Sequence, residues 1–558
     1  MESAPVGPGR AEGHRDTAAN ATSAPLPADS LTNPIGFRAR SRHRLTTPEA
    51  TAGGVEEFAG MAGKEPSRWA NIWLWRAAPA VGPGLLMLVL GLVGATRPGL
   101  SLDEVTTADV AGRSSAQIWQ LAQSIDAVFA PYYLFIHLWT SLVGTTDLTL
   151  RLPSIIAMSG VVALTGELGR RLFGPLTGTV AALLLCVMPN ASRYAAEARP
   201  YAFALLFSLL ALLLLLWTLH RPGVGRWIGY GAAVLLVGLS HVIALTTLAA
   251  HVAVLLRHRR DAGFRRLLWH WAVATGLAVA LLLPLLWLGV NQRDDQVDWV
   301  ADPTLRALSR FPAQVVGSEP GAWFLLGLAV VALRHPARQV GPLLVLALAP
   351  IAVVLAVALL GVSFWVPRYL LVVLPPLALM AALGLLHPLP HSADGLRRIA
   401  VAFGVAALAV LLLAFVVLPD QRKVRQPTVK SGGDYRGAAA IIARDRQPGD
   451  VLVHPPGTRS LRAGLDHYLR SVPDRPRDVL MERSAAEVGR LRAQEYPNAA
   501  AKLRGTARVW LLVTARRPDP TTGRPDLGPL LRTEYQRTRI WYLDTATLAL
   551  YVRRDATA

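Results

Sequence analysis

Residues 77–105 read AAPAVGPGLLMLVLGLVGATRPGLSLDEV, an apolar run that ends shortly before two adjacent carboxylates. The run from Ala77 to Thr96 is long enough to cross a bilayer, which takes roughly 17–25 apolar residues. Asp103 and Glu104 then stand just outside the membrane. Carboxylates are costly to place near lipid, so an adjacent pair at this position indicates a functional site rather than a scaffold.

The composition indicates a polytopic α-helical membrane protein. Of the 558 residues, 52% are hydrophobic and 17% are charged, which excludes an ordinary soluble enzyme. The formal net charge of +20 fits Arg-rich cytoplasmic loops beside anionic headgroups. No basic motif with interleaved aromatic residues is present, so nucleic acid is not an expected partner. Cys186 is the single cysteine, which excludes a disulfide within the chain.

Apolar runs predict the membrane-spanning helices. The clear runs are 77–96, 152–169, 175–191, 200–219, 268–290, 340–361, 368–386 and 398–418, and the shorter ones are 322–334 and a pair within 227–256. Arg-rich connections should face the cytoplasm, which requires a hairpin turning near His241. The same requirement makes residues 126–144 a helix along the outer surface rather than a span. The prediction is about eleven transmembrane helices, with the N-terminus inside and the C-terminus outside.

Composition divides the chain into three parts. Residues 1–70 are rich in Ala, Gly, Pro, Ser and Arg, and predict a disordered cytoplasmic tail. Residues 71–418 hold the predicted spans. Residues 419–558 predict a small extracytoplasmic α/β domain, with a helix over 437–444, strands over 450–454 and 509–514, and a hairpin over 539–552. This part has no nucleophile, metal or phosphate-loop spacing, so we interpret it as an accessory domain.

Two carboxylate groups of the first outer loop are candidate catalytic residues. Asp103 or Glu104 could act as a general base on an acceptor hydroxyl, or the pair could simply cap a surface helix. Asp126, followed by Tyr132 and Tyr133, could be a second carboxylate facing the same cavity or an N-cap acid. As a second carboxylate it could bind the sugar, hold a divalent ion or orient the acceptor.

Two later outer segments offer groups that bind phosphate. The first is the stretch RYAAEARPY, which contains Arg193, Tyr194, Glu197, Arg199 and Tyr201. The second is the pair Arg368 and Tyr369 at the outer end of a span. Arginine suits a phosphate because its fork donates two hydrogen bonds, although an interfacial arginine can also be a membrane anchor. His241 is a further candidate for lining the outer cavity.

These motifs resemble the GT-C superfamily, and within it polyprenyl-phosphate-sugar transferases similar to protein O-mannosyltransferases and aminoarabinose transferases of bacterial glycosyltransferase family 39 type. DEV at 103–105 looks like the acidic pair of the family's first loop. The segment from Asp126 through Tyr132 and Tyr133 to LRLPS at 150–154 looks like its next conserved stretch, and RYAAEARPY looks like its third. RYL at 368–370 and DYRGA at 434–438 resemble late motifs of bacterial members. The chain departs from the pattern at 128–130, where it has Val-Phe-Ala instead of His-Pro-Pro.

The resemblance implies inverting transfer of one sugar, plausibly mannose, from a polyprenyl-phosphate donor to a glycan, glycolipid or protein outside a bacterial plasma membrane. Asp103 would be the base, and Glu104 and Asp126 would position the acceptor, the sugar or a divalent ion. Arg199 and Arg368 would stabilise the departing lipid phosphate. The lipid tail would lie in a groove between membrane helices.

Two alternatives remain open from the sequence. One is a transporter of a lipid-linked saccharide, for which paired half-chain repeats and helices broken near mid-membrane would be expected. The gathering of polar residues at one face favours the enzyme instead. The other is a non-catalytic envelope assembly protein whose working part is the C-terminal domain.

Overall fold

The computed structural model describes residues 66–297, 299–387, 395–427, 429–430 and 434–554. The described residues from Ser67 onward form one compact unit. The predicted tail over residues 1–70 lies almost wholly outside the described residues.

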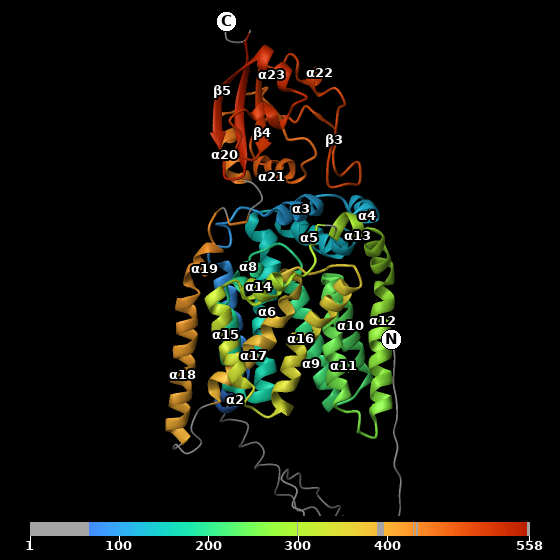
Figure 1. Ribbon diagram of the computed structural model, residues 1–558, viewed down its shortest axis with the longest axis vertical. Helices are drawn as coiled ribbons and strands as arrows, with labels where there is room; N and C mark the ends of the chain where they lie inside the picture. The colour runs from blue at the N-terminus through green and yellow to red at the C-terminus, as the bar shows by residue number, and fades with distance from the viewer. Residues whose placement is uncertain (1–65, 298, 388–394, 428, 431–433, 555–558) are drawn as a thin grey trace, which may run out of the picture. The chain divides into compact units, whose positions relative to one another are not determined.

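Apolar helices make up the membrane part and run side by side in Figure 1. They are α2 Pro66–Leu92, α6 Asp147–Phe173, α7 Pro175–Val187, α9 Tyr201–His220, α10 Val224–Ser240, α11 Leu248–Leu256, α12 Phe264–Asn291, α15 Glu319–Ala332, α16 Ala337–Leu359, α17 Leu374–Leu386 and α18 Gly395–Val416. Small residues let them pack closely: a Cβ atom on Gly178 of α7 would lie 2.3 Å from the backbone oxygen of Gly166 in α6, and one on Gly169 of α6 would lie 2.6 Å from the Cα of Gly178.

The described residues contain six helical segments that are long and apolar enough to cross a membrane, or eight if two bent helix pairs each count as one span. This confirms a multi-pass membrane protein, whereas the predicted number of about eleven spans is not confirmed. Three of the predicted spans correspond to shorter apolar helices, Ala77–Leu92, Val224–Ser240 and Val242–Leu256. The interruption predicted near His241 is present, because its backbone is extended between α10 and the 3₁₀ helix η2 Val242–Thr247.

Two helix pairs bend sharply near the same end of the bundle. Helix α7 is followed by α8 Pro189–Ala195 at 71°, and α14 Leu305–Val316 is followed by α15 at 93°. The predicted span 175–191 is therefore broken. Pro189 explains the break, since a proline has no N–H to continue the preceding helix and is favoured at a first helical position.

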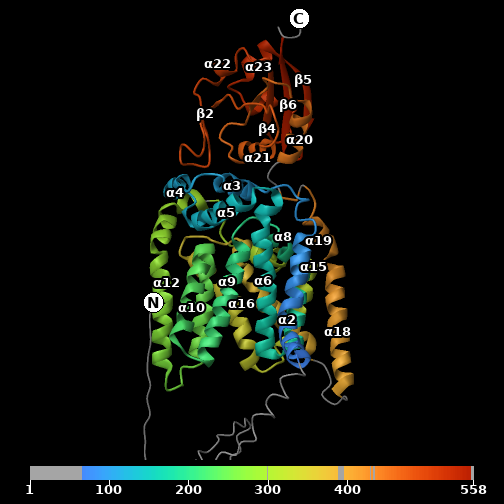
Figure 2. The same cartoon turned by 180° about the vertical axis from the view of Figure 1, so that it is seen from behind.

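Short helices of the first loop lie across one end of the bundle, as both views show (Figures 1 and 2). They are α3 Leu102–Ala111, α4 Ser115–Ser124, the 3₁₀ turn η1 Ala127–Phe129 and α5 Ala130–Val143. The surface helix predicted over 126–144 corresponds to η1 and α5. The remaining short elements of the membrane part are α13 Arg293–Val297, η3 Pro367–Val373 and α19 Leu418–Lys423.

The C-terminal part is a small α/β structure, as predicted. Its strands are β1 Val451–Val453, β2 Met481–Arg483, β3 Gln494–Glu495, β4 Arg508–Thr514, β5 Tyr535–Tyr542 and β6 Ala546–Arg553, and its helices are α20 Tyr435–Asp445, α21 Ser460–Leu469, α22 Ala499–Leu503, η4 Pro520–Gly523 and α23 Gly528–Glu534. The main sheet has the order β1-β4-β6-β5, in which β1 and β4 are parallel and the other neighbours antiparallel. The predicted hairpin is β5–β6, beginning earlier than expected at Tyr535.

One hydrophobic cluster joins the first loop to the C-terminal part. It contains Leu100 and Val105 from the loop, together with Tyr435, Leu465 and Trp510 from the C-terminal part, all of them buried. The segment that carries Asp103 is therefore held by packing from both sides of the cluster. This packing holds in place the backbone around the candidate site.

Candidate active site

The two adjacent carboxylates begin helix α3. Ser101 is its N-cap: its side-chain oxygen accepts from the backbone N–H of Glu104, and the Glu104 carboxylate accepts from the backbone N–H of Ser101. Consecutive residues of a helix point in directions about 100° apart. Glu104 therefore turns into the protein with no exposed surface, whereas Asp103 is half-buried.

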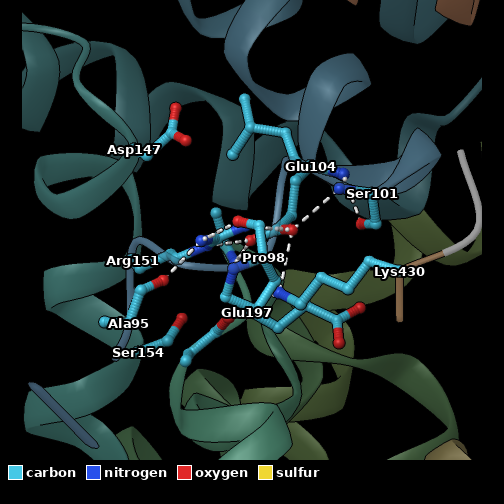
Figure 3. Close-up of polar contacts among 12 residues, drawn as sticks. Ala95, Pro98, Ser101, Glu104, Asp147, Arg151, Ser154, Glu197 and Lys430 are labelled. Atoms are coloured by element: carbon cyan, nitrogen blue, oxygen red, sulfur yellow. Dashed lines mark hydrogen bonds and ion pairs between the residues drawn. The ribbon is translucent and has the colours of Figure 1, made fainter. Parts of the chain in front are cut away.

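Glu104 lies at the centre of a buried charge cluster (Figure 3). Arg151 of α6 donates to both of its oxygens, at 2.7 and 2.9 Å, and the Lys430 ammonium donates to Oε2 at 2.9 Å. The backbone N–H of Ala198 donates to Oε1 at 3.0 Å. Burial raises the pKa of the Glu104 carboxyl, but Arg151 and Lys430 lower it by more, so this pKa lies well below its usual range. An ionised carboxylate with every oxygen engaged is suited to holding structure rather than to accepting a proton.

Arg151 also holds the segment that leads to Asp103. Its guanidinium donates to the backbone oxygens of Ala95, Pro98 and Gly99 while it pairs with Glu104. Arg151 lies in the LRLPS stretch, but the sequence pattern predicted no role for it and none for Lys430. The sequence did indicate that Arg151 is paired, because a charged residue inside an apolar helix needs a buried partner.

The surroundings of Asp103 include cationic and phenolic side chains. No hydrogen bond or ion pair of its carboxylate occurs within the described part of the chain. Its charge interacts electrostatically with Arg199, Arg368 and Tyr201. The structure thus brings three of the predicted substrate-binding residues into the neighbourhood of the predicted base.

Arg199 is almost completely buried in the loop between α8 and α9. Its guanidinium lies over the ring of Phe129 at 4.2 Å and donates to the Tyr133 hydroxyl at 3.5 Å. Burial lowers the pKa of this guanidinium, but Asp103 and the nearby phenols raise it by more, so the pKa ends well above its usual value. Arg199 is therefore a permanent positive charge that interacts electrostatically with Asp103.

Asp126 connects to the same network through Tyr133. The Tyr133 hydroxyl donates to the Asp126 carboxylate at 3.0 Å. Asp126 stands at the N-cap position of η1 with a left-handed backbone, φ 59°, but its side chain makes no capping hydrogen bond. Its carboxylate is directed to the site network instead of to a helix end. Tyr132 is also buried and packs edge-on against Phe203.

Aromatic rings line the side of the site that faces the bundle. His241 lies 4.6 Å from Tyr369 and 5.7 Å from Tyr201, measured between ring centroids, and Tyr194 lies 5.5 Å from Tyr201. Arg368 lies over the rings of Tyr369 and Trp299, at 5.6 and 5.5 Å. Aromatic faces beside charged groups are suited to a sugar ring, which has both apolar C–H faces and hydroxyl groups.

Glu197 is a second buried carboxylate next to the charge cluster. Arg193 stands 3.8 Å from its Oε2, an atom that accepts no hydrogen bond from the described residues. Burial raises the pKa of the Glu197 carboxyl, and the charge of Glu104 adds to this effect. Residues 193–201 therefore contribute both arginine side chains and a carboxylate to the site.

A cavity of about 840 Å³ adjoins this group of residues. Arg193, Tyr194 and Arg368 line it, so the cavity and the site share three predicted residues. Its other charged lining residues are Arg310, Glu319, Asp420 and Lys423. The cavity is large enough for a phosphate with part of an attached chain, and its four cationic side chains favour an anion.

No group of three His, Cys, Asp or Glu side chains that could hold a metal ion occurs among the described residues. The divalent ion considered for Asp126 therefore stays a prediction.

A family model described as dolichyl-phosphate-mannose-protein mannosyltransferase matches residues 130–287, from α5 to α12. The predicted resemblance to the GT-C superfamily is confirmed. A structure of ArnT from Cupriavidus metallidurans with bound undecaprenyl phosphate is similar, with 16% identity and a TM-score of 0.55, and the alignment covers 87% of this chain and 98% of that chain. The apo structure of the same ArnT gives 15% identity and a TM-score of 0.54, covering 86% and 98% of the two chains. No curated protein matches the chain in sequence.

These findings bear on two predictions. The matching family model is one of mannosyltransferases, in agreement with the predicted enzyme class. The GT-C-like fold with a small C-terminal sheet is likewise confirmed. The similarity to ArnT concerns the fold, since the identity is low.

Proposed function

We propose that this protein transfers one sugar, with mannose as the first candidate, from a polyprenyl-phosphate donor to an acceptor hydroxyl, with inversion at the anomeric carbon. The observation that carries the proposal is the half-buried Asp103 carboxylate, which has no hydrogen-bond or ion-pair partner in the described chain and interacts electrostatically with Arg199 and Arg368. A free carboxylate beside fixed cations can take a proton from a hydroxyl while the cations receive a leaving anion.

The proposed reaction is a single displacement. Asp103 accepts the proton of the acceptor hydroxyl, and the oxygen bonds to the anomeric carbon of the donor sugar. The bond from that carbon to the phosphate oxygen breaks, and the electron pair leaves with the lipid phosphate. Arg368, with Arg193 beside the same cavity, stabilises the charge on the phosphate. Attack from the face opposite the phosphate inverts the anomeric carbon.

Asp103 is favoured over Glu104 as the base because of their different surroundings. The Glu104 oxygens are engaged by Arg151, Lys430 and two backbone N–H groups, and its low pKa makes it a weak proton acceptor. We therefore assign Glu104 to organising the loop. Asp126 would orient the acceptor or the sugar through the Tyr133 network.

Two findings support a polyprenyl phosphate as the donor. The similar ArnT structure contains undecaprenyl phosphate, and the cavity beside Arg368 carries four cationic side chains. Trp323, which also lines this cavity, is 62% exposed, as is usual for a side chain next to lipid. The phosphate would lie in the cavity and the isoprenoid chain would extend into the bilayer.

The proposed location is a bacterial plasma membrane. The N-terminal tail, residues 1–70, would be cytoplasmic, and residues 71–418 would form the membrane domain with the site at its outer face. Residues 419–558 would be an extracytoplasmic accessory domain. The acceptor would be a glycan, a glycolipid or a protein on that side of the membrane.

The test is transfer of radiolabel from polyprenyl-phosphate-mannose by the purified full-length protein in lipid vesicles, with an envelope extract as acceptor. We expect label to leave the lipid with the wild type. Arg368→Gln should slow the release by about 10²–10³-fold, the effect of removing one donor to a developing anion. Arg306→Gln is the matched control, because Arg306 is an exposed residue of α14 outside the cavity lining.

Other polyprenyl-phosphate sugars are then tried with the same proteins. Label that crosses the vesicle while it stays on the lipid would identify a transporter and overturn the proposal. Failure of every polyprenyl-phosphate sugar with the wild type would overturn it as well.

A further inference from the structure

The linker that follows the last membrane helix lies along the first loop. Arg425 donates to the backbone oxygens of Leu90 and Val93 at the end of α2, at 3.1 and 3.3 Å. The backbone N–H of Gly99 donates to the oxygen of Pro427 at 3.2 Å. The linker therefore follows the same segment that leads to Asp103, although more than 300 residues separate the two in sequence.

Lys430 extends this contact into the charge cluster. Its ammonium donates to Glu104 Oε2 at 2.9 Å and to the backbone oxygen of Ala196 at 2.5 Å (Figure 3). The lysine side chain is 4% exposed. One ammonium thus connects the first loop, which carries Asp103, with the loop that carries Arg199.

We propose that Lys430 is a positioning residue of the active site, which fixes Asp103 relative to Arg199 by holding these two loops together. This inference rests on the proposed function for its catalytic consequence. The contacts that carry it are independent of any substrate, because they join the linker, the N-terminus of α3 and the loop between α8 and α9.

The geometry indicates how the effect would arise. Glu104 binds the second loop in one place, through the N–H of Ala198, and Lys430 binds it in another, through the oxygen of Ala196. Without the ammonium, the Ala196 oxygen loses its donor and Glu104 keeps only Arg151 as a cationic partner. A shift of about 1 Å between reacting groups can cost about 10²-fold in rate, so a small separation of the loops is sufficient.

The experiment compares Lys430→Met and Lys430→Arg with the wild type in the full-length protein. Lys502→Met is the matched control, because Lys502 is exposed on α22 and stacks on Tyr496. Sugar transfer gives kcat and KM, and hydrogen exchange is measured on peptides covering 97–111 and 196–204. Lys430→Met should lower kcat by about 10–10²-fold with little change in KM, and raise exchange in these two peptides only.

Lys430→Arg should recover much of kcat, since a guanidinium can also donate to Glu104 and Ala196. A wild-type kcat with wild-type exchange in Lys430→Met would overturn the inference. So would faster exchange throughout the chain, which would indicate a general loss of stability. If the wild type transfers no sugar, the proposed function fails, while the exchange of the two peptides still decides whether Lys430 holds the loops.

Discussion

Asp103 and Glu104 are neighbours in sequence but have different electrostatic surroundings. Glu104 is fully buried between Arg151 and Lys430, and Asp103 stands half-buried without a partner in the described chain. A buried ion pair is strongly destabilised when one member is removed, because the remaining charge is left unpaired. The two carboxylates should therefore respond to substitution in different ways.

Glu104→Gln should lower the free energy of unfolding by about 3–5 kcal/mol, because Arg151 and Lys430 lose the carboxylate with which both form ion pairs. The folded-state pKa of Glu104 is lowered, so the stabilisation by Glu104 is present above the usual pKa of a glutamate and is lost as the pH falls towards the folded-state value. Thermal unfolding from pH 8 to pH 3 should show a constant difference from the wild type that shrinks below about pH 4.5.

Glu482→Gln serves as the control, since Glu482 is exposed on β2. A difference between the wild type and Glu104→Gln that appears only as the pH rises above neutrality would contradict this account of the cluster.

At the scale of elements, two helices of the first loop begin with the same motif. Ser101 and Glu104 form a capping box at α3, and Ser114 and Gln117 form one at α4. The caps are equivalent as local structure, but only the first also contributes to the buried charge cluster. Comparing substitutions of the two N-cap serines therefore distinguishes an effect on helix stability from an effect on the candidate site.

Ser101→Ala and Ser114→Ala should each cost about 1 kcal/mol of stability, the usual cost of losing an N-cap. Only Ser101→Ala should also slow sugar transfer, because the first turn of α3 carries Asp103. Thermal unfolding and transfer rates of both variants check this. Equal losses of transfer in the two variants would contradict a special role for the α3 cap.

The elements show how far the sequence alone determines the structure. The apolar runs predicted the long helices because lipid tolerates few polar groups, and α6 and α9 lie close to the ranges 152–169 and 200–219. The bend between α7 and α8 was missed, although Pro189 is a visible signal for it. Apolar segments close to the shortest length that crosses a bilayer, such as Ala77–Leu92, do not determine the number of transmembrane helices.

Membrane topology also made part of the candidate site predictable from the sequence. Placing Arg-rich loops on one face of a membrane gathers the other polar loops at the opposite face, so Asp103, Arg199 and Arg368 were expected together. Lys430 could not be found this way, because a lysine in a polar linker gives no sign of burial. Its partner, Glu104, lies 326 residues away in sequence, and only the folded structure brings them into contact.

At the scale of the molecule, the C-terminal part shares both its core and a polar junction with the first loop. Asp147, the first residue of α6, accepts from Arg436 of α20 and from Tyr468 of α21, the latter at 3.0 Å. The Tyr468 hydroxyl also accepts from the backbone N–H of Leu100 at 3.1 Å. We therefore expect the two parts to lose structure together rather than as independent domains.

Tyr468→Phe should lower the free energy of unfolding by about 1–2 kcal/mol, since it leaves the Leu100 N–H without its acceptor. Thermal unfolding followed by a probe in each part should show coincident transitions, in the wild type and in the variant. Tyr542→Phe is a control from an exposed position on β5. Separate transitions for the membrane helices and the sheet would contradict this coupling.

The central claim, that Asp103 is the general base, is tested most directly by sugar transfer with Asp103→Asn. The matched control is Asp109→Asn, which lies on the same helix and pairs with Arg113 away from the buried cluster. We expect Asp103→Asn to keep the wild-type unfolding temperature and donor binding but to transfer sugar about 10²–10⁴-fold more slowly, while Asp109→Asn stays close to the wild-type rate. An equally folded Asp103→Asn protein that transfers sugar at the wild-type rate would contradict it.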